Sequence, residues 1–184
     1  MIYVNPPAAV LVADPPWAFG DSLPGASRGA AKNYATLSMR ALTEFPLPPL
    51  ARDCHLFLWH PASFQVEAVD LAIEWGFKPK AQLIWQKLTR SGKPWFGMGR
   101  IVRNSHETCM IATRGKPTVL RKDVRSTFSA NVPVDAEGKT IHSAKPNEFY
   151  EIVEALCSGP LVELFARKYR VRWYQYGNEL DKVV

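Results

Sequence analysis

The chain has few cysteines and no long apolar run. Its three cysteines, Cys54, Cys109 and Cys157, form no CxxC pair, which predicts reduced thiols in a cytoplasmic protein. Its four histidines also lack metal-ligand spacing, so we expect no metal site. No window approaches the roughly 18 apolar residues of a membrane span. The start, MIYVNPPAAV, lacks the basic and apolar regions of a signal peptide. We therefore expect no membrane association.

Repeats and low-complexity linkers are absent as well. With 184 residues, 47% hydrophobic and 22% charged, the chain is typical of one globular domain, residues 1–184, with no room for a separate target-recognition domain. Its net charge of +6 is unevenly placed: ten Lys or Arg and only two acids lie between Lys87 and Arg125, which gives that window +8 and the rest −2. Such a window is either a solvated basic face or a phosphate-binding surface.

Short apolar runs alternate with helical patterns. We expect strands at 10–13, 55–59, 81–87, 107–113, 161–166 and, at an edge, 171–177. We expect helices over 64–75 and from about Pro146 to Gly159, and irregular structure over 114–140. This alternation predicts an α/β sheet, mostly parallel, with helices on both faces. Ligands of such sheets bind at the carboxyl ends of the strands, where the loops 20–33 and 88–105 would also lie.

The stretch VLVADPPWAFG places an acid, two prolines and a tryptophan at the end of the first strand. Prolines have no N–H, so the turn offers carbonyl oxygens without the usual donors. The Asp14 carboxylate and the Pro15 carbonyl can each accept one hydrogen of an exocyclic amine, and Trp17 can stack on its ring. These bonds expose the nitrogen lone pair as a nucleophile. Alternatively, Pro15 and Pro16 merely end the strand and Trp17 caps the core.

Several motifs occur in an order that resembles one enzyme family. They are ADPPW, NYATLS, LFLW, EWGF, LIWQK, RNSHE, RGKP, HSAKPNEFYEIVE, VELFAR and GNEL. Together they resemble the adenine N(6)-methyltransferases related to the seventy-kilodalton adenosine methyltransferase subunit, the MT-A family. The compact length is similar to its bacterial or phage branch. The resemblance covers nearly the whole chain.

The resemblance implies a fold, a cofactor and a set of residues. The fold is a Rossmann-like methyltransferase sheet, mostly parallel, with an antiparallel C-terminal strand and permuted motif order. The cofactor is S-adenosyl-L-methionine, and Asp14 lies beside it. The other residues implied at the cofactor are Ser143, Lys145, Glu163, Phe165, Ala166, Arg167, Asn178 and Glu179. Ser143 and Lys145 would hold the methionine carboxylate, helped by a helix N-terminus; the alternative for Lys145 is an exposed first-turn lysine.

The substrate implied is adenine in a nucleic acid, and the base must be flipped out of a duplex or taken from a single strand. The candidate substrate-binding residues are Tyr34, Lys93, Trp95, Arg100, Arg103 and His106. The basic window would contact phosphates, and Trp95 would either stack on bases or anchor its loop to the core. DNA is the favoured substrate, because the bacterial and phage branch includes DNA enzymes; RNA is the alternative. A homodimer, a partner subunit and a non-catalytic nucleic-acid scaffold also remain open.

Overall fold

A computed structural model describes residues 2–18, 36–97, 99, 101–141, 143–178 and 180. Its seven-stranded sheet has the order β5-β3-β4-β2-β1-β6-β7. The strands are β1 (Ala8–Ala13), β2 (Leu50–His60), β3 (Lys78–Leu88), β4 (His106–Arg114), β5 (Thr127–Asn131), β6 (Leu161–Leu164) and β7 (Trp173–Tyr176). The helices are α1 (Met39–Thr43), the short 3-10 helix η2 (Ala62–Phe64), α2 (Gln65–Glu74) and α3 (Asn147–Leu156). No described helix is long and apolar enough to cross a bilayer.

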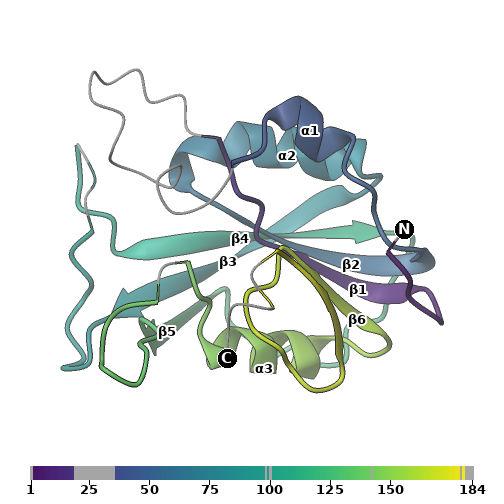
Figure 1. The fold of residues 1–184 in the computed structure, drawn as a ribbon. Helices are drawn as coiled ribbons and strands as arrows, with labels where there is room; N and C mark the ends of the chain where they lie inside the picture. The colour runs from purple at the N-terminus through teal and green to yellow at the C-terminus, as the bar shows by residue number, and fades with distance from the viewer. Residues whose placement is uncertain are drawn as a thin grey trace.

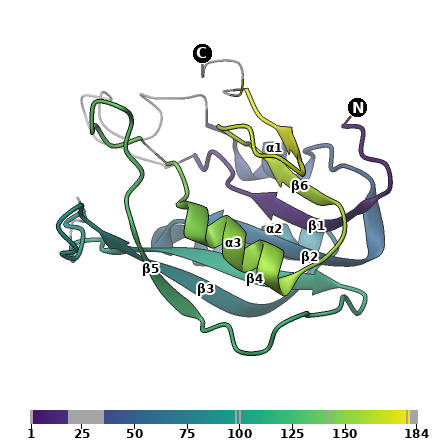
Figure 2. The same cartoon turned by 90° about the horizontal axis from the view of Figure 1, so that it is seen from below.

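Helices cover both faces of the sheet, as the sequence predicts (Figures 1 and 2). One apolar core packs α1 and α2 against one face through residues such as Leu42 and Leu71, and a second packs α3 against the other through Phe149 and Val153. Alternate residues of each central strand enter different cores: Leu58 belongs to the first and its neighbours Phe57 and Trp59 to the second. The sheet is therefore buried between two helical layers.

The antiparallel strand is β4, and the expectation of an antiparallel C-terminal strand is wrong. β4 pairs antiparallel with both β2 and β3, whereas β7 pairs parallel with β6. The segment 89–105 turns directly from β3 into β4, so the chain reverses there. The segment 165–172 instead returns to the edge where β6 began, and β7 therefore runs in the same direction. The edge position of β7 is confirmed.

Two elements were not expected from the sequence. β5 lies in the stretch 114–140 that we expected to be irregular, and it pairs parallel with β3 at the sheet edge. Only Ala130 of its five residues is buried, so an apolar pattern is absent. α1 has five residues, too few for helical periodicity to show, and Ser38 caps it by accepting a hydrogen bond from the Ala41 amide.

The topology places the functional loops at one edge. β1, β2, β3, β5, β6 and β7 all run in one direction, so their carboxyl ends share that edge. Asp14 directly follows β1, and the described part of the loop 88–105 leaves β3 at the same edge. The amino end of β4 lies there too, because this strand runs in reverse. The loop 20–33 lies outside the described residues.

Candidate active site

Two pockets meet at the carboxyl edge of the sheet. The larger has a volume of about 370 Å³ and lies toward β6 and α3; the smaller, of about 270 Å³, lies toward β2 and β4. Both are lined by Asp14, Ser143 and Lys145. These three residues therefore stand between the two pockets, which gives one ligand in each pocket access to the same carboxylate.

A network of partly buried charges surrounds Asp14. The Lys145 ammonium donates to Asp14 Oδ2 at 2.6 Å and lies 3.3 Å from Glu107 Oε2, while Lys87 pairs with the other oxygen of Glu107. The Lys145 side chain is only 6% exposed, so its alternative as an exposed first-turn lysine is wrong. Lys145 also lies 5.0 Å from the Trp59 ring centroid. The network fixes where Asp14 points.

Charge pairing outweighs burial in this network. Burial lowers the pKa of Lys145, but Asp14 and Glu107 raise it by more, so the net shift is upward. Burial raises the pKa of Glu107, but Lys145 and Lys87 hold it below its ordinary value of 4.5. Lys145 is therefore a fixed cation and Glu107 a fixed anion at neutral pH.

The low pKa of Glu107 predicts a pH dependence of stability. A carboxyl whose pKa is depressed by folding contributes stability above its unfolded value, near 4.5, and loses it as the pH falls through the folded value. We expect Glu107→Gln to be less stable than the wild type at pH 7 and to lose less stability on acidification below pH 4.5. Chemical denaturation from pH 2 to 8 measures both, with Glu74→Gln on α2 as the exposed control. If the unfolding free energies of Glu107→Gln and wild type fall equally with pH below 4.5, Glu107 does not have a lowered pKa in the folded protein.

The DPPW turn is more tightly bonded than its sequence suggests. The Pro15 carbonyl accepts the Trp17 amide at 2.9 Å, and the Pro16 carbonyl accepts the Leu37 amide at 2.8 Å. Each carbonyl keeps one further acceptor position. Trp17 is 4% exposed, packs 5.4 Å from Phe64, centroid to centroid, and donates from Nε1 to a backbone carbonyl of β2. Most of its ring therefore caps the core, although Trp17 also lines the smaller pocket.

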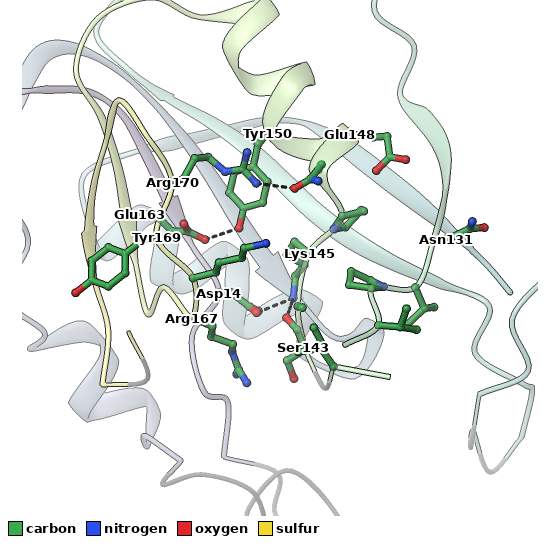
Figure 3. A pocket seen from close by; sticks show the side chains of 18 of the residues that line it. Asp14, Asn131, Ser143, Lys145, Glu148, Tyr150, Glu163, Arg167, Tyr169 and Arg170 are labelled. Atoms are coloured by element: carbon green, nitrogen blue, oxygen red, sulfur yellow. Dashed lines mark hydrogen bonds and ion pairs between the residues drawn. The ribbon is translucent and has the colours of Figure 1, made fainter. Parts of the chain in front are cut away.

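The larger pocket holds most of the residues implied at the cofactor. Glu163 at the end of β6 is 6% exposed and accepts hydrogen bonds of 2.7 Å from Tyr150 on α3 and from Gln175 on β7. Burial raises the pKa of Glu163, with Asp14 adding to it. Phe165 has a φ of 62°, in the left-handed region that favours glycine. Figure 3 shows Glu163, Tyr150 and Arg170 grouped apart from the Asp14–Lys145 pair.

Other predicted residues lie at the rim or outside the description. Arg167 also lines the larger pocket, Ala166 is buried behind it, and Asn178 is exposed and does not line it. His106 lines the smaller pocket. Lys93, Trp95 and Arg103 line neither pocket, and the guanidinium of Arg103 lies 5.0 Å from the Phe96 ring. Tyr34, Arg100 and Glu179 lie outside the described residues.

Sequence reasoning assigned no role to several site residues. They are Trp59, Glu107, Tyr150 and Arg170, and Lys87, expected in the phosphate-binding window, instead pairs with Glu107. For Lys87 and Glu107 a signal was available, because a charged residue at the end of a buried strand is the feature that identified Asp14. His60, the last residue of β2, lines the smaller pocket; its Nε2 is buried with no hydrogen-bond partner among the described residues. Burial lowers the pKa of His60.

Comparison with known proteins agrees with the motif order. The family described as MT-A70 matches residues 8–179, which is nearly the whole chain. This chain belongs to the MT-A70 family. In this chain, the DPPW turn, the Glu107–Lys145 network and the two pockets occupy one contiguous site.

Three relatives illustrate the similarity. An N(6)-adenosine-methyltransferase MT-A70-like protein of Drosophila melanogaster is 30% identical over 95% of this chain and 27% of its own length. The human N(6)-adenosine-methyltransferase catalytic subunit METTL3 is 29% identical over 95% of this chain and 28% of its own length. The Type II methyltransferase M.MunI of a Mycoplasma species is 26% identical over 93% of this chain and 77% of its own length. The chain thus spans just over a quarter of the first two MT-A70 proteins.

Proposed function

We propose that this protein is an S-adenosylmethionine-dependent methyltransferase that acts on the 6-amino group of adenine in DNA. The observation that carries the proposal is the meeting of two pockets at Asp14. A methyl transfer requires a donor and an acceptor to approach one point from different sides. The larger pocket is assigned to the donor and the smaller to the adenine.

The larger pocket fits S-adenosylmethionine. Its volume is sufficient for part of a cofactor-sized ligand, it carries both acidic and basic side chains, and the left-handed turn at Phe165 lies at its wall. Asp14, Ser143, Glu163, Phe165 and Arg167 would line the cofactor, with Ala166 behind them and Asn178 and Glu179 near its adenosine portion. When bound, this cofactor supplies an electrophilic methyl group.

The acceptors of the smaller pocket prepare the adenine amine. Asp14 accepts one amine hydrogen, and the Pro15 carbonyl accepts the other with its remaining acceptor position. Positive charge develops on the amine during transfer, and these acceptors lie ready to stabilise it. Lys145 orients Asp14, and Glu107 holds Lys145 in place. Trp17 forms part of the pocket wall, and the Pro16 carbonyl holds the turn by accepting the Leu37 amide.

The nucleic acid would enter over the smaller pocket. His106 contacts the flipped base or its sugar, and the loop 88–105 contacts the backbone. DNA is favoured because this chain spans 77% of the length of M.MunI, which supports the compact branch for which the sequence resemblance implies DNA. RNA remains the second candidate, because two longer relatives are named N(6)-adenosine methyltransferases. For assembly, the proposal includes two alternatives: the protein forms a homodimer, or it acts with a partner subunit.

The exposed basic residues of the loop provide a separate test. Lys93→Ala and Arg103→Ala are expected to weaken nucleic-acid binding similarly for all sequences, and each should reduce the salt slope of log K by about 1. Fluorescence anisotropy at several salt concentrations measures this. Lys80→Ala, on the amino-terminal part of β3 away from the site, is the matched control. Unchanged salt slopes in both variants would remove these residues from the binding surface.

The proposed function itself is tested by methyl transfer. Wild-type protein with labelled S-adenosylmethionine is incubated with adenine-containing DNA and RNA oligonucleotides, single- and double-stranded. We expect label on N6 of adenine, and we expect more label on DNA than on RNA. More label on RNA than on DNA would show that RNA, and not DNA, is the preferred substrate. No label on either, with no cofactor binding by calorimetry, would support the scaffold alternative.

A further inference from the structure

The segment between β3 and β4 carries exposed apolar side chains at its outer end. Ile101 is 98% exposed, its neighbour Val102 is 70% exposed and Phe96 is 71% exposed. We call Ile101 and Val102 the apolar tip. In Figure 1 the segment projects beyond the strands at the left of the view. Single apolar residues are common on protein surfaces, but a group of them on one projecting segment indicates a surface that contacts another molecule.

Local contacts hold the base of the apolar tip together. The Arg103 guanidinium carbon lies 5.0 Å from the Phe96 ring centroid, and Nη1 donates to the Gly99 carbonyl at 3.2 Å. The Gly97 amide donates to the Asn104 carbonyl at 3.0 Å. These contacts join the two sides of the segment and place Arg103 over the Phe96 ring. The apolar tip itself remains exposed.

The apolar tip stands at the mouth of the smaller pocket. Asn104 lines this pocket, and Ile101 lies three positions before it, a span of about 11 Å at most. On the other side of the segment, Lys87 also lines the pocket, and its amide donates to the Ser105 carbonyl at 2.9 Å. Both ends of the segment are therefore fixed at the pocket wall. The tip lies within reach of a nucleotide whose base enters the pocket.

The charge and shape of the segment favour double-stranded nucleic acid. The sequence has no Asp or Glu between Leu88 and His106, and Arg90 and Lys93 are exposed, so the segment attracts phosphates. Proteins that bind single strands use aromatic rings on which the bases stack. Aliphatic side chains instead act on duplexes, where they insert between base steps and unstack them.

We propose that the apolar tip inserts into a DNA duplex beside the target adenine and occupies the space that the base leaves when it turns into the smaller pocket. The proposal rests on the proposed function and narrows its substrate to double-stranded DNA. An adenine inside a duplex is stacked and paired, so its extrusion costs free energy. Burial of Ile101 and Val102 among the bases removes their apolar surface from water and offsets part of that cost.

Methyl transfer to two duplexes tests this role. Both contain the sequence that the wild type labels best. One pairs the target adenine with thymine, and the other places an abasic site opposite it, which lowers the cost of extrusion. We expect the double variant Ile101→Ser/Val102→Ser to lose ~10- to 100-fold in kcat/KM on the paired duplex. On the abasic duplex we expect a loss of less than about threefold.

Fluorescence measures extrusion without the chemical step. 2-Aminopurine at the target position becomes brighter when it leaves the base stack. With S-adenosylhomocysteine present, saturating wild-type protein should raise the fluorescence of the paired duplex. The double variant should give a much smaller rise at saturation, because the extruded state is less stable without the inserted side chains.

The matched control is Val66→Ser/Ile73→Ser on α2. It makes the same change at side chains that are 70% and 55% exposed and that line neither pocket. It should behave as the wild type in both assays. The melting temperatures of both double variants should stay within ~2 °C of the wild type, because exposed side chains contribute little to stability.

Three outcomes would overturn the inference. They are wild-type rates of the Ile101→Ser/Val102→Ser variant on the paired duplex, an equal loss on both duplexes, and a wild type that labels single strands but not duplexes. The proposed function fails in a different way, by the absence of label from every oligonucleotide with the wild type. That result would overturn the inference together with the function on which it rests.

Discussion

Asp14→Asn is expected to reduce methyl transfer ~100- to 1000-fold while the protein remains folded. The substitution keeps the size of the side chain but removes the negative charge placed where positive charge develops on the amine, an effect worth ~100- to 1000-fold for a single electrostatic contact. It also removes one of the two anions that neutralise Lys145. Single-turnover label transfer from S-adenosylmethionine measures the loss.

The control for this variant is Asp70→Asn on the exposed side of α2. It changes the same chemical group far from both pockets and should retain full activity. Calorimetry should show that Asp14→Asn still binds a nucleoside probe, and circular dichroism should match the wild type. Wild-type rates in Asp14→Asn would show that the catalytic assignment is wrong.

Gly177→Ala is expected to damage the fold at the base of the larger pocket. A Cβ at this position would lie 2.0 Å from the Ala166 carbonyl oxygen and 2.7 Å from the Ala166 nitrogen. The backbone must come this close because the Ala166 amide donates to the Tyr176 carbonyl at 3.0 Å. Overpacking against backbone costs about 3 kcal/mol, or ~6–12 °C in melting temperature for a chain of this size. Differential scanning calorimetry measures this.

Gly76→Ala distinguishes a clash from lost backbone freedom. Gly76 has a φ of 82° but nothing within 4 Å of an added Cβ, so the alanine costs only backbone strain, about 1 kcal/mol. Gly177→Ala should therefore be the more destabilised of the two, and it alone should weaken cofactor binding. If Gly76→Ala is equally or more destabilised, the close approach of Gly177 to Ala166 is not what the site depends on.

Local pattern was sufficient for most of the elements. Apolar runs located six of the seven strands, and helical spacing located α2 and α3. β5 was not predicted, because only one of its five residues is buried and the strand therefore has no apolar pattern. Strand ends were placed less well: β2 starts at Leu50, before the expected residue 55, because the polar pair Arg52 and Asp53 extends beyond the covered part of the sheet. Exposed strand residues need not be apolar, so composition does not mark such an end.

The candidate site likewise has one part that the sequence predicted and one part that it did not. The DPPW turn could be placed at a strand end from the sequence, because an acid after a buried strand has few other positions. The partner of Asp14 could not, since Lys145 lies 131 residues away in the chain. The sequence left Lys145 either exposed or at a ligand, and the structure excludes the exposed environment. Lys145 lies between two carboxylates, because HSAKP brings the lysine back to the edge where β1 and β4 meet the pockets.

By itself the sequence determined the layers, the family and the acid at the end of β1, because these depend on residue order and on short-range periodicity. The tertiary structure decided the reversed direction of β4, the burial of Lys145 between Asp14 and Glu107, and the stacking of Arg170 on Tyr150. Each of these depends on residues distant in the chain. Their contacts arise only when packing of the two cores fixes the strand order, and no local pattern encodes that order.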